Sequence, residues 1–347
     1  MANVVQAEKK IALLHRYPKE QISETNAAFP YLAKKGMDVL TFKKFNRLSS
    51  WKKFLKSVVW IFYAPLLVLG RGYDVIYCDD SYPFYPILVK LASPRSKVIL
   101  RIGDFHLMYY YKGLIYFILH TLETWGWFIS DRIIVISETM REKVALDLYY
   151  FSCTVGEGWE EEIKKKIHVV LDPVELWHTH LRRKKSRGSV MFHGVLTKNK
   201  NVDILLEAAR RLPKVIFIVI GDGPDRQRLE SLAPPNVIFK GWVPFHKIPH
   251  AISSCAIGLA LRSGNPGNEY VLTSPFLQYG MMGKPCLVTR RKVYGDYEWQ
   301  FSDVGEMVEK IKILLTRPEE GKKLRKYIVE NHDAKKIGDQ IWSLLCV

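Results

Sequence analysis

The sequence predicts an α/β protein of two domains, each a parallel sheet covered by helices, that face each other across a cleft. Apolar runs of strand length alternate along the chain with longer segments of helical period, which is typical of this fold class. The 347 residues exceed the size at which one hydrophobic core usually stops growing. The alternation stops in a polar stretch, Asp172 to Ser189, and then restarts, which indicates a linker between two domains.

Each predicted sheet follows from a series of apolar runs. Before the linker we expect six strands: Ile11 to Leu14, Val39 to Phe42, Val75 to Cys78, Val98 to Ile102, Arg132 to Ile136 and Ile167 to Leu171. After it we expect five: Val190 to His193, Val215 to Ile220, Val237 to Lys240, Ile257 to Ala260 and Cys286 to Val288. The expected domains are therefore 1–175 and 176–320. A helical tail, 321–347, is expected to pack back on the N-terminal domain, with a break near Asn331 and His332.

The composition points to a reducing compartment. The five cysteines are scattered singly, with no CxxC pair. No apolar run reaches the roughly 18 to 20 residues that span a bilayer, and the polar N-terminus lacks the apolar core of a signal peptide. We expect a cytoplasmic protein, either soluble or peripheral at the inner face of the membrane.

The net charge of +17 is concentrated in clusters. One cluster, Lys43 to Trp60, interleaves lysines and an arginine with aromatic residues and contains no acid, which suits peripheral contact with an anionic membrane. The alternative is a core helix whose basic side chains snorkel to solvent. A second aromatic run, Phe105 to Trp127, is expected to line an acceptor channel or to fill an interdomain wall. No nucleic-acid recognition motif accompanies the charge, so we expect no nucleic-acid partner.

The segment Gly264 to Pro285 carries the clearest site signal. A loop rich in Gly and Asn leads to Ser274 and Pro275, residue types that cap a helix and occupy its first position. The first amides of a helix lack intrahelical partners and lie at the positive end of its dipole. The segment therefore predicts an anion site, suited to the diphosphate of a nucleotide.

Two further turns follow predicted strands. Gly221 and Gly223 end an apolar strand and precede a helix, so the backbone there can approach a ligand, although an ordinary strand-to-helix turn has the same composition. Gly194 ends another strand, and Lys200 stands just before the next helix. A lysine at that point can stabilise a leaving diphosphate, or it can be a solvated cation.

Taken in order, these motifs resemble the C-terminal half of the retaining glycosyltransferases of family 4, which have the GT-B fold of two Rossmann-like domains. Gly194-Val195-Leu196 to Lys200-Asn201, Gly221 to Pro224, Gly241-Trp242-Val243 and Gln278 to Pro285 resemble the family's motifs in order and spacing. The likeness spans roughly Ser189 to Leu315. In the N-terminal half the likeness is thinner: Ser130 to Ser137 and Lys166 to Asp172 resemble the family's last strands before the crossover, and Asp104 matches the aspartate of its His-Asp pair.

The resemblance implies a hexosyltransferase-type enzyme that uses a nucleotide-diphosphate sugar, retains configuration and needs neither a metal nor a cofactor. The acceptor would be a glycan or a lipid-linked molecule. Donor binding falls to Arg16, Gly194, Lys200, Gly221, Gly223, Val243, Tyr270, Thr273, Ser274 and Gln278. Catalysis falls to Asp104, which would activate or orient the acceptor hydroxyl, to His106, whose alternative is a local cap or surface residue, and to Glu269 beside the transferred sugar.

Three positions depart from the family pattern. Val195 replaces a diphosphate-binding arginine, Gln278 replaces a ribose-binding glutamate, and Gly103 replaces a histidine. Strict spacing also puts Tyr270 where the sugar-side glutamate belongs, with Glu269 one residue away. An amide can hydrogen-bond a ribose without the added strength of a charged acceptor. The alternative function is therefore a nucleotide-sugar-binding protein with weakened catalysis.

Overall fold

The structure is a computed structural model that describes residues 9–15, 27–41, 50–79, 82, 84–105, 107–108, 111–152, 160–174 and 188–347. The chain forms two compact units. Unit 1 comprises Met1–Pro173 together with Ala334–Val347, and unit 2 comprises Val174–Asp333. Within the described ranges, no helix combines the length and the hydropathy needed to span a bilayer.

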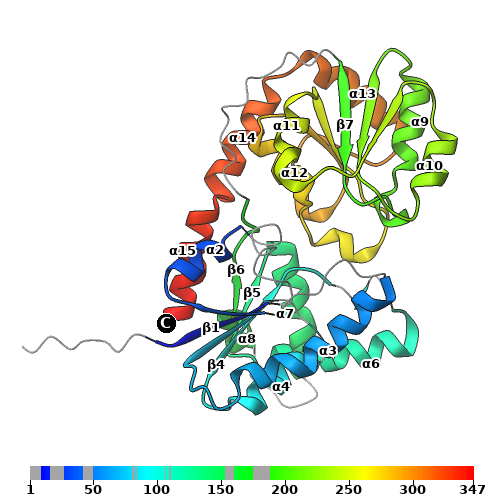
Figure 1. Cartoon of the computed structure of the whole chain (residues 1–347). Coiled ribbons are helices and arrows are strands. Elements are labelled where there is room, and N and C mark those ends of the chain that lie inside the picture. The colour runs from blue at the N-terminus through cyan, green and yellow to red at the C-terminus, as the bar shows by residue number, and fades with distance from the viewer. Residues whose placement is uncertain are drawn as a thin grey trace, which may run out of the picture. The chain divides into compact units, whose positions relative to one another are not determined.

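Unit 1 contains a parallel sheet of six strands in the order β2-β1-β3-β4-β5-β6 (Figure 1). The strands are β1 (Ile11–His15), β2 (Asp38–Thr41), β3 (Val75–Asp79), β4 (Lys97–Ile102), β5 (Arg132–Val135) and β6 (Ile167–Val169). Every residue of β1 and of β3 is buried, because helices cover both faces of a parallel sheet. Apolar runs without alternation are thus the expected sequence pattern.

The helices of unit 1 form two layers. The chain moves in one direction across the sheet from β2 to β6, and right-handed crossovers place the intervening helices on one face. These are α3 (Ser50–Val68), α4 (Tyr85–Ala92), α6 (Gly113–Ile129), α7 (Glu138–Ser152) and α8 (Glu160–Lys166). The step from β1 to β2 runs the other way, so α2 (Phe29–Lys34) covers the opposite face. There it packs against α15 (Ala334–Cys346), whose Ile337, Ile341 and Leu345 are buried in the core of unit 1 (Figure 1).

Unit 2 contains a second parallel sheet of six strands, in the order β12-β11-β10-β7-β8-β9. Its strands are β7 (Ser189–His193), β8 (Ile216–Ile220), β9 (Val237–Gly241), β10 (Ile257–Ala260), β11 (Cys286–Thr289) and β12 (Gln300–Phe301). Its α-helices are α9 (Asp203–Arg211), α10 (Arg226–Leu232), α11 (Ile248–Ser253), α12 (Ser274–Met281), α13 (Val304–Thr316) and α14 (Glu320–Asn331). Short 3-10 helices, η2 (Lys198–Lys200), η3 (Phe245–Lys247), η4 (Pro266–Glu269) and η5 (Lys292–Tyr294), lie in its loops.

The C-terminal tail divides between the two units. Helix α14 packs against α12 in unit 2 so closely that a Cβ atom on Gly280 would lie 2.6 Å from Ile328. The chain then leaves the helix at Asn331, and α15 joins unit 1. The segment 321–347 thus contains two helices with different partners. The contacts place the passages between units at 173–174 and 333–334, against the expected 175–176 and 320–321.

Candidate functional site

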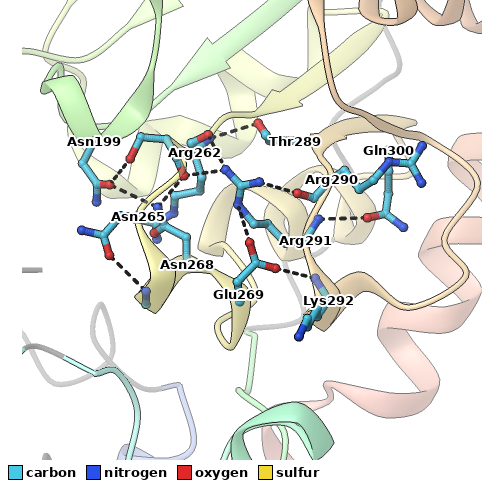
Figure 2. Close-up of polar contacts among 12 residues, drawn as sticks. Asn199, Arg262, Asn265, Asn268, Glu269, Thr289, Arg290, Arg291, Lys292 and Gln300 are labelled. Atoms are coloured by element: carbon cyan, nitrogen blue, oxygen red, sulfur yellow. Dashed lines mark hydrogen bonds and ion pairs between the residues drawn. The ribbon is translucent and has the colours of Figure 1, made fainter. Parts of the chain in front are cut away.

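The carboxyl edge of the unit 2 sheet brings together loops that are distant in sequence. The side-chain oxygen of Asn199, after β7, accepts hydrogen bonds from Ser263 Oγ at 2.6 Å and from Asn268 Nδ2 at 3.1 Å. Both donors follow β10, and Ser263 N also donates to the carbonyl of Asn199 at 2.8 Å. The loop with Lys200 is therefore fixed to the loop that leads to α12 (Figure 2).

Glu269 is held by the loop after β11. Its Oε2 atom accepts a hydrogen bond from Lys292 N at 3.0 Å, and its Oε1 atom lies 3.6 Å from Arg291 Nε. Arg291 is itself fixed by donating to the carbonyl oxygens of Arg262, at 3.2 Å, and of Ser263 (Figure 2). The Glu269 carboxylate, which we expect beside the transferred sugar, is thus partly exposed and held in place by an ion pair with Arg291.

Helix α12 begins one residue earlier than the sequence suggested. Thr273 is the capping residue, with extended backbone, and its hydroxyl accepts from Phe276 N at 3.3 Å. Ser274 and Pro275 are therefore the first two helical residues, and the expectation that Ser274 caps the helix is wrong. Both residue types can cap, so the backbone conformation decides between them. Since Pro275 has no N–H and the N–H of Phe276 is bonded to the cap, Ser274 N is the first-turn amide that remains for an anion.

The glycine turns after β7 and β8 pack against each other. A Cβ on Gly221 would lie 1.9 Å from the carbonyl oxygen of Gly194, and one on Gly223 would lie 2.3 Å from that of Leu196. Gly221 also has φ +141°, which disfavours other residues. Leu196 N donates to Asp222 O at 2.9 Å across the same contact. The close approach of the two turns is therefore the first reason why these positions hold glycine.

Lys200 ends η2, next to the end of β7. Burial, and then the positive charge of Lys200, lower the pKa of His193 to about 4. His193 is therefore neutral at pH 7, and its ring lies 4.9 Å from that of Tyr279 on α12. Lys200 thus supplies positive charge at this edge without a second cation from His193.

Three other predicted donor residues lie on the same unit. Gln278 is about nine-tenths buried on α12, and Tyr270 is the residue that follows η4 and caps its C-terminus. Val243, after β9, is partly buried against the core cluster that includes Phe276. They come from the ends of β9 and β10 and from the helix that follows β10, so they belong to the same edge of the sheet as Lys200.

In unit 1, the structure places one of the predicted residues. Asp104 follows β4, is partly exposed, and accepts a hydrogen bond from the adjacent Phe105 N at 2.8 Å. Arg16 and His106 lie outside the described residues, as do most side chains of Lys43 to Trp60. Of the three N-terminal candidates, Asp104 alone therefore has a described position.

Sequence reasoning missed a buried charge network at the carboxyl edge of unit 1. Asp79, at the end of β3, accepts from Arg101 Nη1 at 2.9 Å and lies 2.6 Å from His15 Nδ1 at the end of β1. Arg101 also donates to Asp172, after β6. Burial raises the pKa of Asp79, but the charge of Arg101 and the hydrogen bond of His15 outweigh it and hold that pKa below its usual value. The network could have been expected from one sequence signal, because polar residues, His15 and Asp79, end the strands β1 and β3.

Comparison with known proteins agrees with these features. Residues 174–335 match the family described as "Glycosyl transferases group 1". No curated protein matches the chain. Among solved structures, the chain is similar to Anabaena Alr3699/HepE in complex with UDP and glucose, with 15% identity, 97% of this chain and 99% of that chain covered, and a TM-score of 0.66.

Two further solved structures match over almost the whole chain. Sucrose-phosphate synthase from Thermosynechococcus elongatus shares 13% identity over 97% of this chain and 98% of that chain, with a TM-score of 0.72. A glycosyltransferase from Rickettsia africae ESF-5 shares 8% identity over 98% of each chain, with a TM-score of 0.66. The likenesses extend over both units and confirm the predicted fold class. The chain therefore has the GT-B fold, and within it residues 174–335 match the group 1 glycosyl transferases.

Proposed function

We propose that this protein transfers a sugar from a nucleotide-diphosphate sugar to a glycan or lipid-linked acceptor in the cytoplasm, with retention of configuration and without a metal or other cofactor. The observation that carries the proposal is the group 1 match over 174–335. In this segment the Lys200 loop, the Gly221 turn and the start of α12 lie at one edge of one sheet. Ligands of open α/β sheets bind at this edge.

Stabilisation of the leaving diphosphate is the main chemical task of the site. Lys200 supplies a full positive charge, and Ser274 N supplies a hydrogen-bond donor at the positive end of α12. As the glycosyl bond breaks, negative charge grows on the diphosphate, so both groups bind the transition state more strongly than the ground state. Proton transfer to the departing group is not required in this scheme.

The remaining proposed roles concern recognition. Gln278 holds the ribose through its amide, and Glu269 binds hydroxyl groups of the transferred sugar while Arg291 fixes its position. Asp104 orients the acceptor hydroxyl and takes up its proton as the new glycosidic bond forms, and His106 is the other catalytic candidate. We propose no role for nucleic acid.

The test is thermal unfolding of the full chain with UDP, GDP, ADP or TDP, alone and with their sugars. UDP is tried first because the HepE structure holds UDP and glucose. A ligand at about 100 times its dissociation constant adds about 2.7 kcal/mol to the free energy of unfolding, which is a shift of several degrees. Lys200→Ala should lose most of this shift. Lys214→Ala is the matched control, since Lys214 is exposed and precedes β8 at the opposite edge of the sheet.

Each outcome bears on the proposal. If none of the nucleotides shifts the melting temperature at millimolar concentration, the proposed donor site is refuted. Equal shifts of the melting temperature in Lys200→Ala and Lys214→Ala would refute the role of Lys200. Turnover that survives EDTA supports metal independence, and the anomeric configuration of the product decides retention.

The second candidate is the binding protein with weakened catalysis. It is favoured by the neutral Gln278, by Val195 in place of an arginine, and by the ion pair that Glu269 makes with Arg291. Binding of a nucleotide sugar without release of free nucleotide, over a panel of sugar acceptors, is its signature. Release of UDP or another nucleoside diphosphate contradicts it.

A further inference from the structure

The outward face of α6 is apolar along its length. Positions 114, 117, 118, 121 and 125 share one side of the helix by their spacing, and all five residues are exposed. Only Thr121 among them is polar, and none is charged. The most exposed members are Leu114, at 73%, and Phe117, at 66%. The exposed large apolar side chains of α6 are Leu114, Ile115, Phe117, Ile118 and Trp125.

The second half of α3, with the turn after it, has the same character. Its exposed large apolar side chains recur at helical spacing: Val59, Phe62, Tyr63, Leu66 and Leu69. Phe62 and Leu66 are each more than 60% exposed. The opposite side of α3 is buried through Trp60, Ala64 and Val68. The helix therefore has an ordinary core face and, in addition, an apolar face that none of the described residues of unit 1 covers.

Both helices belong to one layer and pack on the same short helix between them. Trp60 of α3 contacts Tyr85 of α4, with ring centroids 6.5 Å apart. Gly126 of α6 lies against Pro86 of α4, where an added Cβ would be 3.1 Å from the proline ring. The right-handed crossovers place all three helices on one face of the sheet (Figure 1). We call the exposed apolar residues of α3, of the turn after it and of α6 the α3–α6 surface.

Acidic residues are scarce in the sequence around this surface, and the one within α6, Glu123, is buried. Residues 39–73, which include α3, hold seven lysines and arginines and no Asp or Glu, and residues 105–122, which include most of α6, hold Lys112 and no Asp or Glu. Helix α9 of unit 2 shows the usual alternative. Its exposed residues are charged: Asp203, Glu207, Arg210 and Arg211. The α3–α6 surface is thus not an average solvated helix layer.

We infer that the α3–α6 surface docks on an anionic lipid bilayer. The apolar side chains would enter the interfacial region, and the basic residues of the same sequence segment would lie near acidic headgroups. A second copy of this chain is the less favourable occupant, because a symmetric pair would bring two cationic segments together without anions between them. The bilayer supplies both the apolar phase and the negative charge. This inference does not depend on the donor site in unit 2.

The test is co-sedimentation of the full chain with vesicles of phosphatidylcholine alone or mixed equally with phosphatidylglycerol. We expect binding to the mixed vesicles that weakens with salt, because anionic headgroups attract the basic segment. The double variant Phe117→Ser/Ile118→Ser should lower the partition coefficient at least about tenfold, since two large apolar side chains are removed from the interface. Ile313→Ser, at an exposed apolar position of α13 in unit 2, is the matched control and should bind as the wild type does.

A second pair, Phe62→Ser/Leu66→Ser, tests α3 separately, and circular dichroism verifies that each variant is folded. Lack of binding to the mixed vesicles at low salt would overturn the inference, as would equal binding by the wild type and both folded double variants. The inference would also be overturned if the wild type sedimented as a dimer in the absence of lipid and both double variants sedimented as monomers. Thermal shifts by nucleotides should be unchanged in these variants, which separates this result from the proposed function.

Discussion

The carboxyl edges of the two sheets use polar residues in different ways. In unit 1, charged groups at the strand ends neutralise one another: Arg101 binds both Asp79 and Asp172, and Asp79 also binds His15. In unit 2, the contacts that join the Lys200 loop to the loop before α12 are made by amides, a hydroxyl and backbone groups of Asn199, Ser263 and Asn268. The same topology therefore carries a buried ion network at the edge of unit 1 and, at the edge of unit 2, the loop contacts that surround the proposed donor site.

This difference has a physical consequence for each unit. A buried ion network costs a great deal to break, because the remaining partner is left as an uncompensated charge. At the unit 2 edge, we expect a single substitution to lower the free energy of unfolding less than in unit 1. We expect its larger effect on the affinity for the proposed nucleotide ligand. Unit 1 should therefore dominate the response of stability to charge changes, and unit 2 the response to nucleotides.

The largest expected effect follows from neutralising the centre of the unit 1 network. Asp79→Asn should lower the free energy of unfolding by about 3 to 5 kcal/mol, because Arg101 loses a buried anionic partner. Urea unfolding monitored by circular dichroism measures it. Asp339→Asn is the control: Asp339 pairs with Lys35 at the surface and should cost less than about 1 kcal/mol. Similar small losses in both variants would contradict the contrast between the edges.

The sequence indicated the helix start at the unit 2 edge but not the unit 1 network, because the residues of that network are far apart along the chain. Pro275 acts locally, because its ring alone restricts the backbone there. Asp79 and His15 are 64 residues apart, and Asp79 and Arg101 are 22 apart, so their pairing depends on strand order. An arginine within an apolar strand gives no sign of its partners.

The shifted cap of α12 shows a second limit of prediction from sequence. Thr273 and Ser274 are both good capping residues, and neither composition nor spacing separates them. The structure selects Thr273 because its extended backbone directs the hydroxyl to Phe276 N, while Tyr294 contacts the same hydroxyl at 3.2 Å. Tyr294 lies in a loop after β11, so the choice depends on a tertiary contact.

The next largest effect sharpens the comparison through pH. Burial lowers the pKa of His120 on α6, but the carboxylates of Asp147 on α7 and of Glu123 on α6 outweigh it and raise that pKa to about 9. A pKa that is higher in the folded state stabilises the protein fully below about pH 6.5, and this stabilisation is lost as pH rises through about 9. Lys143 also faces this cluster through Asp147. The contribution is at most about 3 kcal/mol.

Urea unfolding between pH 6 and pH 10 tests this, with His120→Gln as the variant. The free energy of unfolding of the wild type should exceed that of the variant most at pH 6. The difference between the two should shrink toward pH 10. A difference that stays constant with pH would show that the ring packing against Tyr116 and Trp127, rather than the charge, gives His120 its role.

The smallest expected effect lies at the unit 2 edge and separates capping from binding. Thr273→Ala removes the hydroxyl that accepts from Phe276 N, so it should lower the free energy of unfolding by about 1 kcal/mol. Thr273→Ser keeps the hydroxyl and should recover most of that loss. With the cap removed, Phe276 N becomes available beside Ser274 N, so the nucleotide-induced thermal shift should persist in Thr273→Ala. Loss of that shift in a folded Thr273→Ala variant, with retention in Thr273→Ser, would instead show that the hydroxyl itself binds the nucleotide.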